Sequence, residues 1–175
     1  MALGQHRQIL QIVGYQNSGK TTVSKTLIRY LTAQALRVGA IKHHGHGGIP
    51  DAPVNKDSTQ HEQAGAIISA VEGAGMLRLA MQAPNWSLAE VLALYEPYHL
   101  DVIIVEGYKQ QHFPKVVLLR NDQDKTLLNL TSICCVLYWP GTTVTDLSIP
   151  HFALQDEESY CTFLLQEMRR LYDNV

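Results

Sequence analysis

The chain has 175 residues, of which 46% are hydrophobic, and its formal net charge at pH 7 is -2. This length and composition are enough for one sizeable core, so we expect a single compact domain over residues 1–175. The basic residues are scattered, which argues against a nucleic-acid partner. The three cysteines are too few for a disulfide framework, and no apolar run resembles a signal peptide or a membrane span. We therefore expect a cytoplasmic protein that has no membrane partner.

The first predicted element is an apolar strand, residues 9–13, which leads into a glycine-rich motif. Residues 14–22 read Gly-Tyr-Gln-Asn-Ser-Gly-Lys-Thr-Thr and contain the phosphate-binding pattern G-x-x-x-x-G-K-[ST]. A P-loop has to leave a buried strand, wrap its backbone N–H groups around phosphates and open a helix. Residues 22–35 provide the helix, because their apolar residues recur at helical spacing. The sequence therefore predicts a site for a nucleoside triphosphate.

Two side chains of this motif have specific predicted roles. Lys20 is expected to reach the β- and γ-phosphates and is a candidate catalytic residue, while the Thr21 hydroxyl is expected to hold Mg²⁺. The whole motif is predicted to bind the nucleotide: Gly14, Tyr15, Gln16, Asn17, Ser18, Gly19, Lys20, Thr21 and Thr22.

The next predicted strand, residues 38–42, runs into a long polar loop that is rich in histidine. We interpret this loop as a switch region, whose basic side chains donate hydrogen bonds to phosphate groups. The candidates are Lys42, His43, His44 and His46. Asp57, further along, is a candidate for contact with Mg²⁺ or with the attacking water, as a catalytic or metal-binding residue. Two alternatives stay open, a Zn or Ni site on the imidazoles and an ordinary solvated loop.

The middle of the chain alternates short helices and strands. A short helix is expected over residues 59–64, followed by strands at 66–71 and 76–81 that a glycine-rich turn joins as an antiparallel hairpin. Ser87 is a suitable N-cap for a helix over residues 88–95.

A second chemical motif follows at residues 101–107, where an apolar strand over 102–105 ends in Glu106 and Gly107. A carboxylate at the end of a buried strand beside a P-loop can hold Mg²⁺ through water, and a following glycine lets the backbone approach the γ-phosphate. We predict Glu106 as a catalytic and metal-binding residue and Gly107 as a nucleotide-binding one. P-loop NTPases more often have Asp at this position, and the alternative is a strand that ends in a solvated Glu.

The remaining predicted elements are strands at residues 115–119 and 133–138 and a last helix from Asp156 to about Arg170. Alternation of strands and helices is typical of a parallel sheet that helices cover on both faces. The sequence thus predicts an α/β protein with the three-layer P-loop NTPase fold, a mostly parallel sheet and one possible antiparallel hairpin.

Taken together, these motifs resemble the molybdopterin-guanine dinucleotide biosynthesis protein B family, in the SIMIBI class of P-loop NTPases. The resemblance rests on residues 14–22, 42–46, 56–59, 64–66 and 105–109. It implies a homodimeric adaptor that binds GTP and Mg²⁺ and hydrolyses GTP weakly, with molybdopterin or molybdopterin guanine dinucleotide as a further bound ligand. The implied partners are the molybdenum cofactor guanylyltransferase and molybdenum-insertion proteins. No clear guanine-reading motif is present, so the preference for GTP rests on the resemblance alone.

Two other functions are compatible with a P-loop. A small-molecule kinase would need an arginine-rich lid to clamp the transferred phosphoryl group, whereas the arginines of this chain are dispersed. A nickel-delivery GTPase would use the histidine cluster as a metal store. Glycines flank these histidines directly after a strand, beside the predicted phosphate site, which favours the adaptor.

Overall fold

The structure is a computed structural model that describes residues 8–45 and 57–172, with the side chains of 57–59 and 171–172 outside the description. The chain separates into two compact units, residues 1–45 together with 93–175, and residues 46–92. The expectation of one domain over the whole chain stays a prediction.

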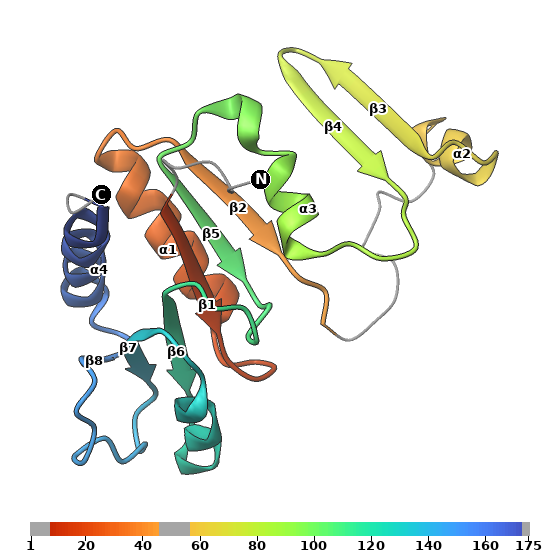
Figure 1. Cartoon of the computed structure of the whole chain (residues 1–175). Coiled ribbons are helices and arrows are strands. Elements are labelled where there is room, and N and C mark those ends of the chain that lie inside the picture. Colours follow the sequence, from red (N-terminus) through yellow and green to blue (C-terminus); the bar gives the residue numbers. More distant parts are fainter. Residues whose placement is uncertain (1–7, 46–56, 173–175) are drawn as a thin grey trace. The chain divides into compact units, whose positions relative to one another are not determined.

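The larger unit is built on a parallel sheet of six strands in the order β2-β5-β1-β6-β7-β8. All neighbouring strands run parallel, and Figure 1 shows the arrowheads of β2, β5, β6 and β7 pointing the same way. The strands are β1 (Gln8–Val13), β2 (Val38–Lys42), β5 (Val102–Glu106), β6 (Lys115–Leu119), β7 (Ile133–Tyr138) and β8 (His151–Ala153). In a parallel sheet all carboxyl ends meet at one edge, and β1 lies inside the sheet with β5 and β6 on either side.

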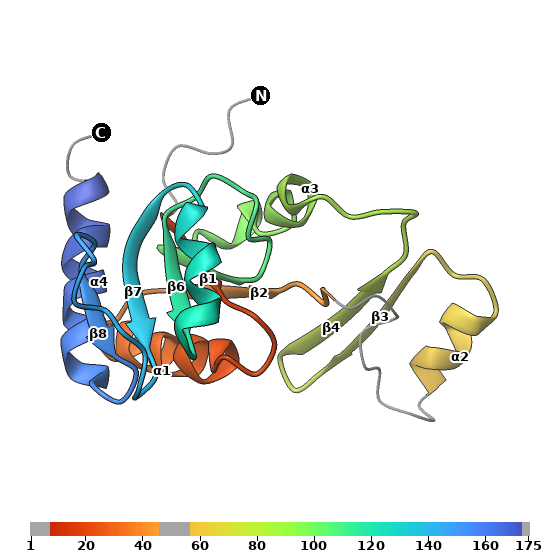
Figure 2. The same ribbon diagram turned by 90° about the horizontal axis from the view of Figure 1, so that it is seen from below.

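Helices cover both faces of this sheet. The helices α1 (Lys20–Ala33) and α4 (Glu157–Tyr172) pack on one face, and the 3-10 helix η2 (Asp122–Asn129) packs on the other. Figure 2 shows α1 and η2 on opposite sides of the strands. Near the sheet edge, the second face also carries the segment around η1 (Glu96–Tyr98), where the Tyr95 hydroxyl donates to the carbonyl oxygen of Ala40 at 2.7 Å. The predicted three-layer arrangement is confirmed.

The alternating residues of β1 supply two separate hydrophobic cores. Leu10 and Ile12 pack with α1 and α4, while Val13 packs with the η2 side. Burial on both faces explains why the interior of β1 is mostly apolar, as is typical of strands inside parallel sheets. Its one polar interior residue, Gln11, is buried and donates to the carbonyl oxygens of Gly107 and Tyr108 at 3.1 and 2.8 Å.

The smaller unit contains α2 (Asp57–Gln63) and the antiparallel hairpin of β3 (Ile68–Gly73) and β4 (Met76–Met81). The predicted hairpin is therefore confirmed. Its two turn residues, Ala74 and Gly75, both have positive φ angles, 51° and 77°, as a type I′ turn requires. The Ser69 hydroxyl donates to the Glu62 carboxylate at 2.7 Å and joins α2 to one face of the hairpin.

The helix α3 (Leu88–Ala93) begins as the sequence predicts. The Ser87 hydroxyl accepts from the backbone N–H of Glu90 at 3.2 Å, and the Glu90 carboxylate accepts from the backbone N–H of Ser87 at 2.8 Å. This reciprocal pair is a capping box, which satisfies two N–H groups at the start of the helix. The helix ends at Ala93, before the predicted Tyr95, because the chain changes to the 3-10 turn at Glu96.

Three short elements were missing from the sequence prediction, η1, η2 and β8. The amide oxygen of Asn121 caps η2 by accepting from the Gln123 backbone N–H at 3.0 Å. The helix is too short for its apolar residues to repeat at a recognisable helical spacing, so the sequence did not indicate it. The strand β8 has three residues and lies at the edge of the sheet, so it leaves no measurable alternation in the sequence. Along the described helices, none is long and apolar enough to cross a membrane.

Lys115 is a charged side chain inside the larger unit. It is 0% exposed, and its ammonium group donates to the carbonyl oxygens of Gln111, Phe113 and Thr131 at 2.8, 3.0 and 2.7 Å. These three bonds use all three ammonium hydrogens and tie the loop before β6 to the segment before β7. Burial lowers the pKa of Lys115, and the hydrogen-bonded carbonyls compensate part of the cost of desolvation.

Lys115→Met should destabilise the fold, because it keeps most of the buried volume and leaves three carbonyl groups without their donor. We expect a loss of about 2–4 kcal/mol in the free energy of unfolding, measured by urea denaturation. The control is Lys25→Met on the exposed side of α1, which should change stability by less than about 0.5 kcal/mol. Equal midpoints for the two variants would contradict the structural role of Lys115.

Candidate nucleotide-binding site

The P-loop lies between the end of β1 at Val13 and the start of α1 at Lys20. A Cβ atom at Gly14 would collide with the Ser18 hydroxyl and lie 3.2 Å from the Cβ atom of Leu118, so a larger residue here would force Ser18 to move. The first turn of α1 has no side-chain cap and no acidic residue. Its leading N–H groups and the positive end of the helix dipole therefore favour an anion at this point.

Lys20 lies among like charges. Its ammonium group donates to the carbonyl oxygen of Tyr15 at 2.7 Å, which places it over the loop. Partial burial lowers the pKa of Lys20, and although Glu106 opposes this shift, neighbouring positive charges lower the pKa further. Those charges belong to Lys42, Arg120 and Lys109. Four cations lie around Lys20 and its loop, counting Lys20 itself, against the carboxylates of Glu106 and Asp124, so the positive charges outnumber the negative ones and favour an anion.

Thr21, Lys42 and Glu106 form a connected polar cluster beside the P-loop. The Thr21 hydroxyl lies 3.0 Å from both carboxylate oxygens of Glu106, and the Lys42 ammonium donates to the Thr21 hydroxyl at 3.3 Å. The Lys42 ammonium also lies 3.6 Å from Glu106 Oε1, and the two residues pair in the register of β2 and β5. Hydroxyl and carboxylate oxygens are the hard ligands that Mg²⁺ prefers, so the donor set fits this ion.

Gly107 is held in a conformation that only glycine adopts easily. Its φ angle is 99°, and a Cβ atom there would lie 2.9 Å from the Cβ atom of His43. Its backbone N–H donates to the carbonyl oxygen of Ile12 at 3.0 Å, so its contribution next to a phosphate would be the absence of a side chain. His43 is fixed beside it, because its N–H donates to the carbonyl oxygen of Glu106 at 2.9 Å and its ring lies 4.3 Å from that of Tyr108.

The remaining predicted residues are not brought to this cluster by any described contact. His44 is exposed next to His43, and His46 lies outside the described residues. Asp57 opens α2 in the smaller unit, and its side chain is also outside the description. No group of three or more His, Cys, Asp and Glu side chains could hold a metal ion, as far as the described residues show. The roles assigned to His46 and Asp57 stay predictions.

The structure adds two residues to the site that the sequence prediction missed. Arg120 donates from Nη1 to the carbonyl oxygen of Gln16 at 2.9 Å, and Trp139 donates from Nε1 to that of Ser18 at 3.0 Å. Each of the two residues follows directly after a predicted strand, at 115–119 and 133–138. A list of the polar side chains directly after every predicted strand would have included both as candidates.

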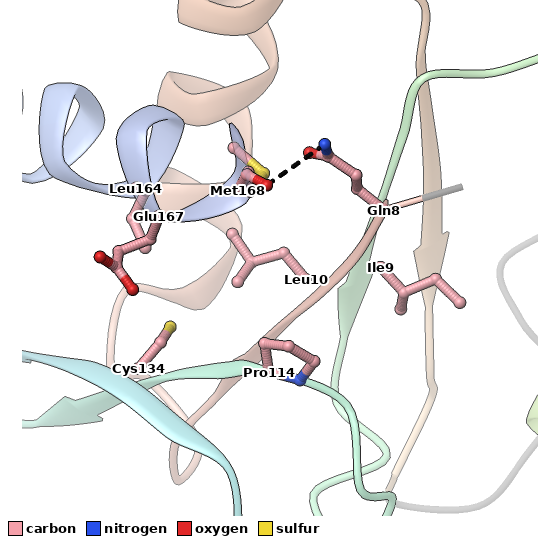
Figure 3. Close-up of a pocket in the computed structure, with 8 residues that line it drawn as sticks. All are labelled: Gln8, Ile9, Leu10, Pro114, Cys134, Leu164, Glu167 and Met168. Atoms are coloured by element: carbon pink, nitrogen blue, oxygen red, sulfur yellow. Dashed lines mark hydrogen bonds between the residues drawn. The ribbon is translucent and has the colours of Figure 1, made fainter. Parts of the chain in front are cut away.

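A small cavity at the other end of β1 is not a ligand site. Its volume is about 10 Å³, which is close to the lower limit for a single water molecule and far below the size of a ligand pocket. Figure 3 shows the lining residues, with the hydrogen bond from Gln8 to the carbonyl oxygen of Met168 at 3.4 Å. They are Gln8, Ile9, Leu10, Pro114, Cys134, Leu164, Glu167 and Met168.

The family profile and two curated relatives that match this chain all name the synthesis of molybdopterin guanine dinucleotide in their descriptions. Residues 9–138 match the profile of the family MobB, described as molybdopterin guanine dinucleotide synthesis protein B. A probable molybdopterin-guanine dinucleotide biosynthesis adapter protein of Bacillus subtilis is 36% identical over 171 residues, which cover 97% of this chain and 98% of the relative. The adapter protein of Escherichia coli is 28% identical over 165 residues, or 93% of this chain and 94% of the relative.

Solved structures agree with the sequence comparison. The crystal structure of a MobB protein homolog from Bacillus stearothermophilus has a TM-score of 0.77 and 38% identity, and covers 93% of this chain and 98% of that chain. HypB from Helicobacter pylori, solved in complex with nickel, has a TM-score of 0.53 at 16% identity, which shows a shared fold alone. The profile spans most of the chain and the Bacillus relatives match nearly all of it, so this chain belongs to the MobB family of molybdopterin guanine dinucleotide synthesis proteins.

Proposed function

We propose that this protein is a GTP-binding adaptor with weak Mg²⁺-dependent GTPase activity in the biosynthesis of molybdopterin guanine dinucleotide. The observation that carries the nucleotide part is the uncapped start of α1 beside the cluster of Thr21, Lys42 and Glu106. The adaptor part is supported by the names of the relatives, which are called adapter proteins of this biosynthesis. The preference for guanine is likewise carried over from the family.

The residues of the cluster have distinct proposed tasks. Lys20 would bind the β- and γ-phosphates, and the N–H groups at the start of α1 would cradle them. Thr21 and Glu106 would hold Mg²⁺, which supplies positive charge against the phosphate oxygens. Lys42 and His43, at the end of β2, would contact the phosphates as donors, while His46 and Asp57 keep the switch roles predicted for them.

Slow hydrolysis fits the way in which Arg120 is used. Its guanidinium donates to the Asp124 carboxylate and to the carbonyl oxygen of Gln16, so it is committed to the protein rather than to a reacting phosphate. An arginine finger increases phosphoryl transfer by about 10³ to 10⁵, so a site that lacks this contribution turns over slowly. We therefore propose that nucleotide binding governs contacts with the guanylyltransferase and molybdenum-insertion proteins, or delivery of the pterin product.

Lys20→Ala should weaken GTP binding by roughly 100-fold or more, because it removes the point charge for the β- and γ-phosphates. Isothermal titration calorimetry with Mg²⁺ and GTP would measure the change. The matched control is Lys25→Ala, on the exposed side of the same helix, which should bind GTP like the wild type. Unchanged affinity in Lys20→Ala would refute the nucleotide site.

Glu106→Gln should weaken GTP binding only in the presence of Mg²⁺, because it keeps the size of the side chain and removes the charge that faces the metal ion. We expect about a tenfold or larger loss with Mg²⁺ and little change when the metal is chelated. Calorimetric titrations with and without EDTA give the two affinities. An equal loss under both conditions would assign Glu106 to the structure of the P-loop instead.

We also propose that the protein forms a homodimer, and that the hairpin provides the contact. The apolar face of the hairpin carries Ile68, Leu77 and Leu79, which are 54%, 56% and 53% exposed. The opposite face receives α2 through the bond between Ser69 and Glu62. An isolated two-stranded hairpin is marginally stable in water, so its open apolar face needs a cover. The same face of a second copy would provide one through a two-fold axis.

Leu79→Lys should convert the dimer into a monomer, since it introduces two charges at the two-fold contact. Val71→Lys is the control, because Val71 is similarly exposed at 48% but points to the opposite face of the same hairpin. Light scattering coupled to size-exclusion chromatography would give the two masses. A monomeric wild type, or a Leu79→Lys variant that stays dimeric, would contradict this contact.

A further inference from the structure

We propose that Arg120 and Trp139 are positioning residues of the triphosphate site, which hold the P-loop in its binding conformation through the carbonyl oxygens of Gln16 and Ser18. This inference rests on the proposed function, because it concerns how the same site is prepared for its ligand. Neither residue belongs to the P-loop motif, and they come from the ends of two different strands, β6 and β7.

The backbone chemistry of the loop explains why such residues are needed. A loop that turns its N–H groups towards an anion turns carbonyl groups away from it, and a carbonyl without a donor costs free energy. The Gln16 oxygen accepts from Arg120 Nη1 at 2.9 Å, and the Ser18 oxygen accepts from Trp139 Nε1 at 3.0 Å. Two alternate carbonyls of the loop are therefore satisfied by side chains that follow β6 and β7.

Arg120 is itself held by a buried carboxylate. Asp124 is 2% exposed, and its oxygens accept from Arg120 Nε at 2.8 Å, from Nη2 at 3.0 Å and from the Arg120 backbone N–H at 3.0 Å. The bidentate pair fixes the plane of the guanidinium and leaves Nη1 directed at Gln16. A lysine could not make this set of bonds, because only the planar guanidinium has donors in a fixed fork.

The same bonds favour a role of Arg120 and Asp124 through the loop over a role as readers of the base. Both carboxylate oxygens of Asp124 are engaged by Arg120, and Arg120 in turn reaches the backbone of the loop. A residue that acts through the loop should alter the affinity for the phosphates of every nucleotide by the same factor. A residue that reads the base should alter the preference between bases.

Trp139 packs its indole against the start of α1. A Cβ atom at Gly19 would lie 3.9 Å from Trp139 Nε1 and 3.5 Å from a methyl group of Leu154. The indole is 39% exposed, so its ring is not required to fill the core, whereas its N–H has a definite acceptor. Trp139→Phe therefore removes the donor while it keeps an aromatic ring against the loop.

The test is calorimetric titration of the full chain with Mg²⁺ and either GTP or inosine triphosphate, which lacks the 2-amino group of guanine. For Arg120→Ala we expect a loss of roughly 10- to 100-fold for both nucleotides, and for Trp139→Phe a loss of roughly 3- to 10-fold. The ratio of the two affinities should stay at the wild-type value in each variant. Asp124→Asn added to Arg120→Ala should cause no further loss, because Asp124 acts through Arg120.

The matched control is Arg170→Ala, which breaks a similar bidentate pair with Glu167 on α4 and should bind both nucleotides like the wild type. Wild-type affinity in Arg120→Ala, or a changed ratio between the affinities for the two nucleotides, would overturn this inference and leave the proposed function standing. If Arg120→Ala does not fold, Trp139→Phe decides, and wild-type affinity in that variant overturns the inference. A wild-type chain that binds neither nucleotide overturns the proposed function together with this inference.

Discussion

The site depends on one constraint of backbone chemistry, that a loop cannot direct its N–H groups at an anion without finding donors for its carbonyl groups. Here the donors come from the ends of β6, which is next to β1, and of β7, which is one strand further on. Trp139 at the end of β7 and Arg120 at the end of β6 donate to the loop, and on the other side Glu106 at the end of β5 accepts from Thr21. Parallel strand order brings all of these ends to one edge, so the sheet builds the loop as much as the loop motif does.

The electrostatics of the site favour a response to a charged ligand. Lys42 is 61% exposed and lies 3.6 Å from Glu106, and a pair with one partner so exposed contributes at most about 1 kcal/mol. A triphosphate with its metal ion would bring larger charges to the same atoms, so this pair can rearrange at small cost. Lys42 ends β2, and His43 follows it, so a rearrangement there acts directly on the chain that leaves the sheet.

The sequence predicted most of the fold, because buried parallel strands leave continuous apolar runs and a P-loop leaves a fixed spacing. The strands at 38–42, 115–119 and 133–138 have the predicted bounds, and the family resemblance is confirmed. The β3 strand lies two residues later than predicted, because the turn uses only Ala74 and Gly75. Arg120 and Trp139 were missed for a different reason: each is a single residue after a strand, and its role depends on the order in which β1, β6 and β7 pair, which no local pattern records.

The position of the smaller unit in the chain supports the proposal that the larger unit binds the nucleotide while the hairpin contacts a second copy. β2 and β5 are direct neighbours in the sheet and run parallel, and such a pair needs only a crossover of about a dozen residues or more, commonly one helix. This chain instead inserts residues 46–92, which form a unit with its own hairpin. All described residues of the two hydrophobic cores belong to the larger unit, and none comes from the hairpin. The exposed apolar face of the hairpin is therefore the feature that supports the proposed contact with a second copy of the chain.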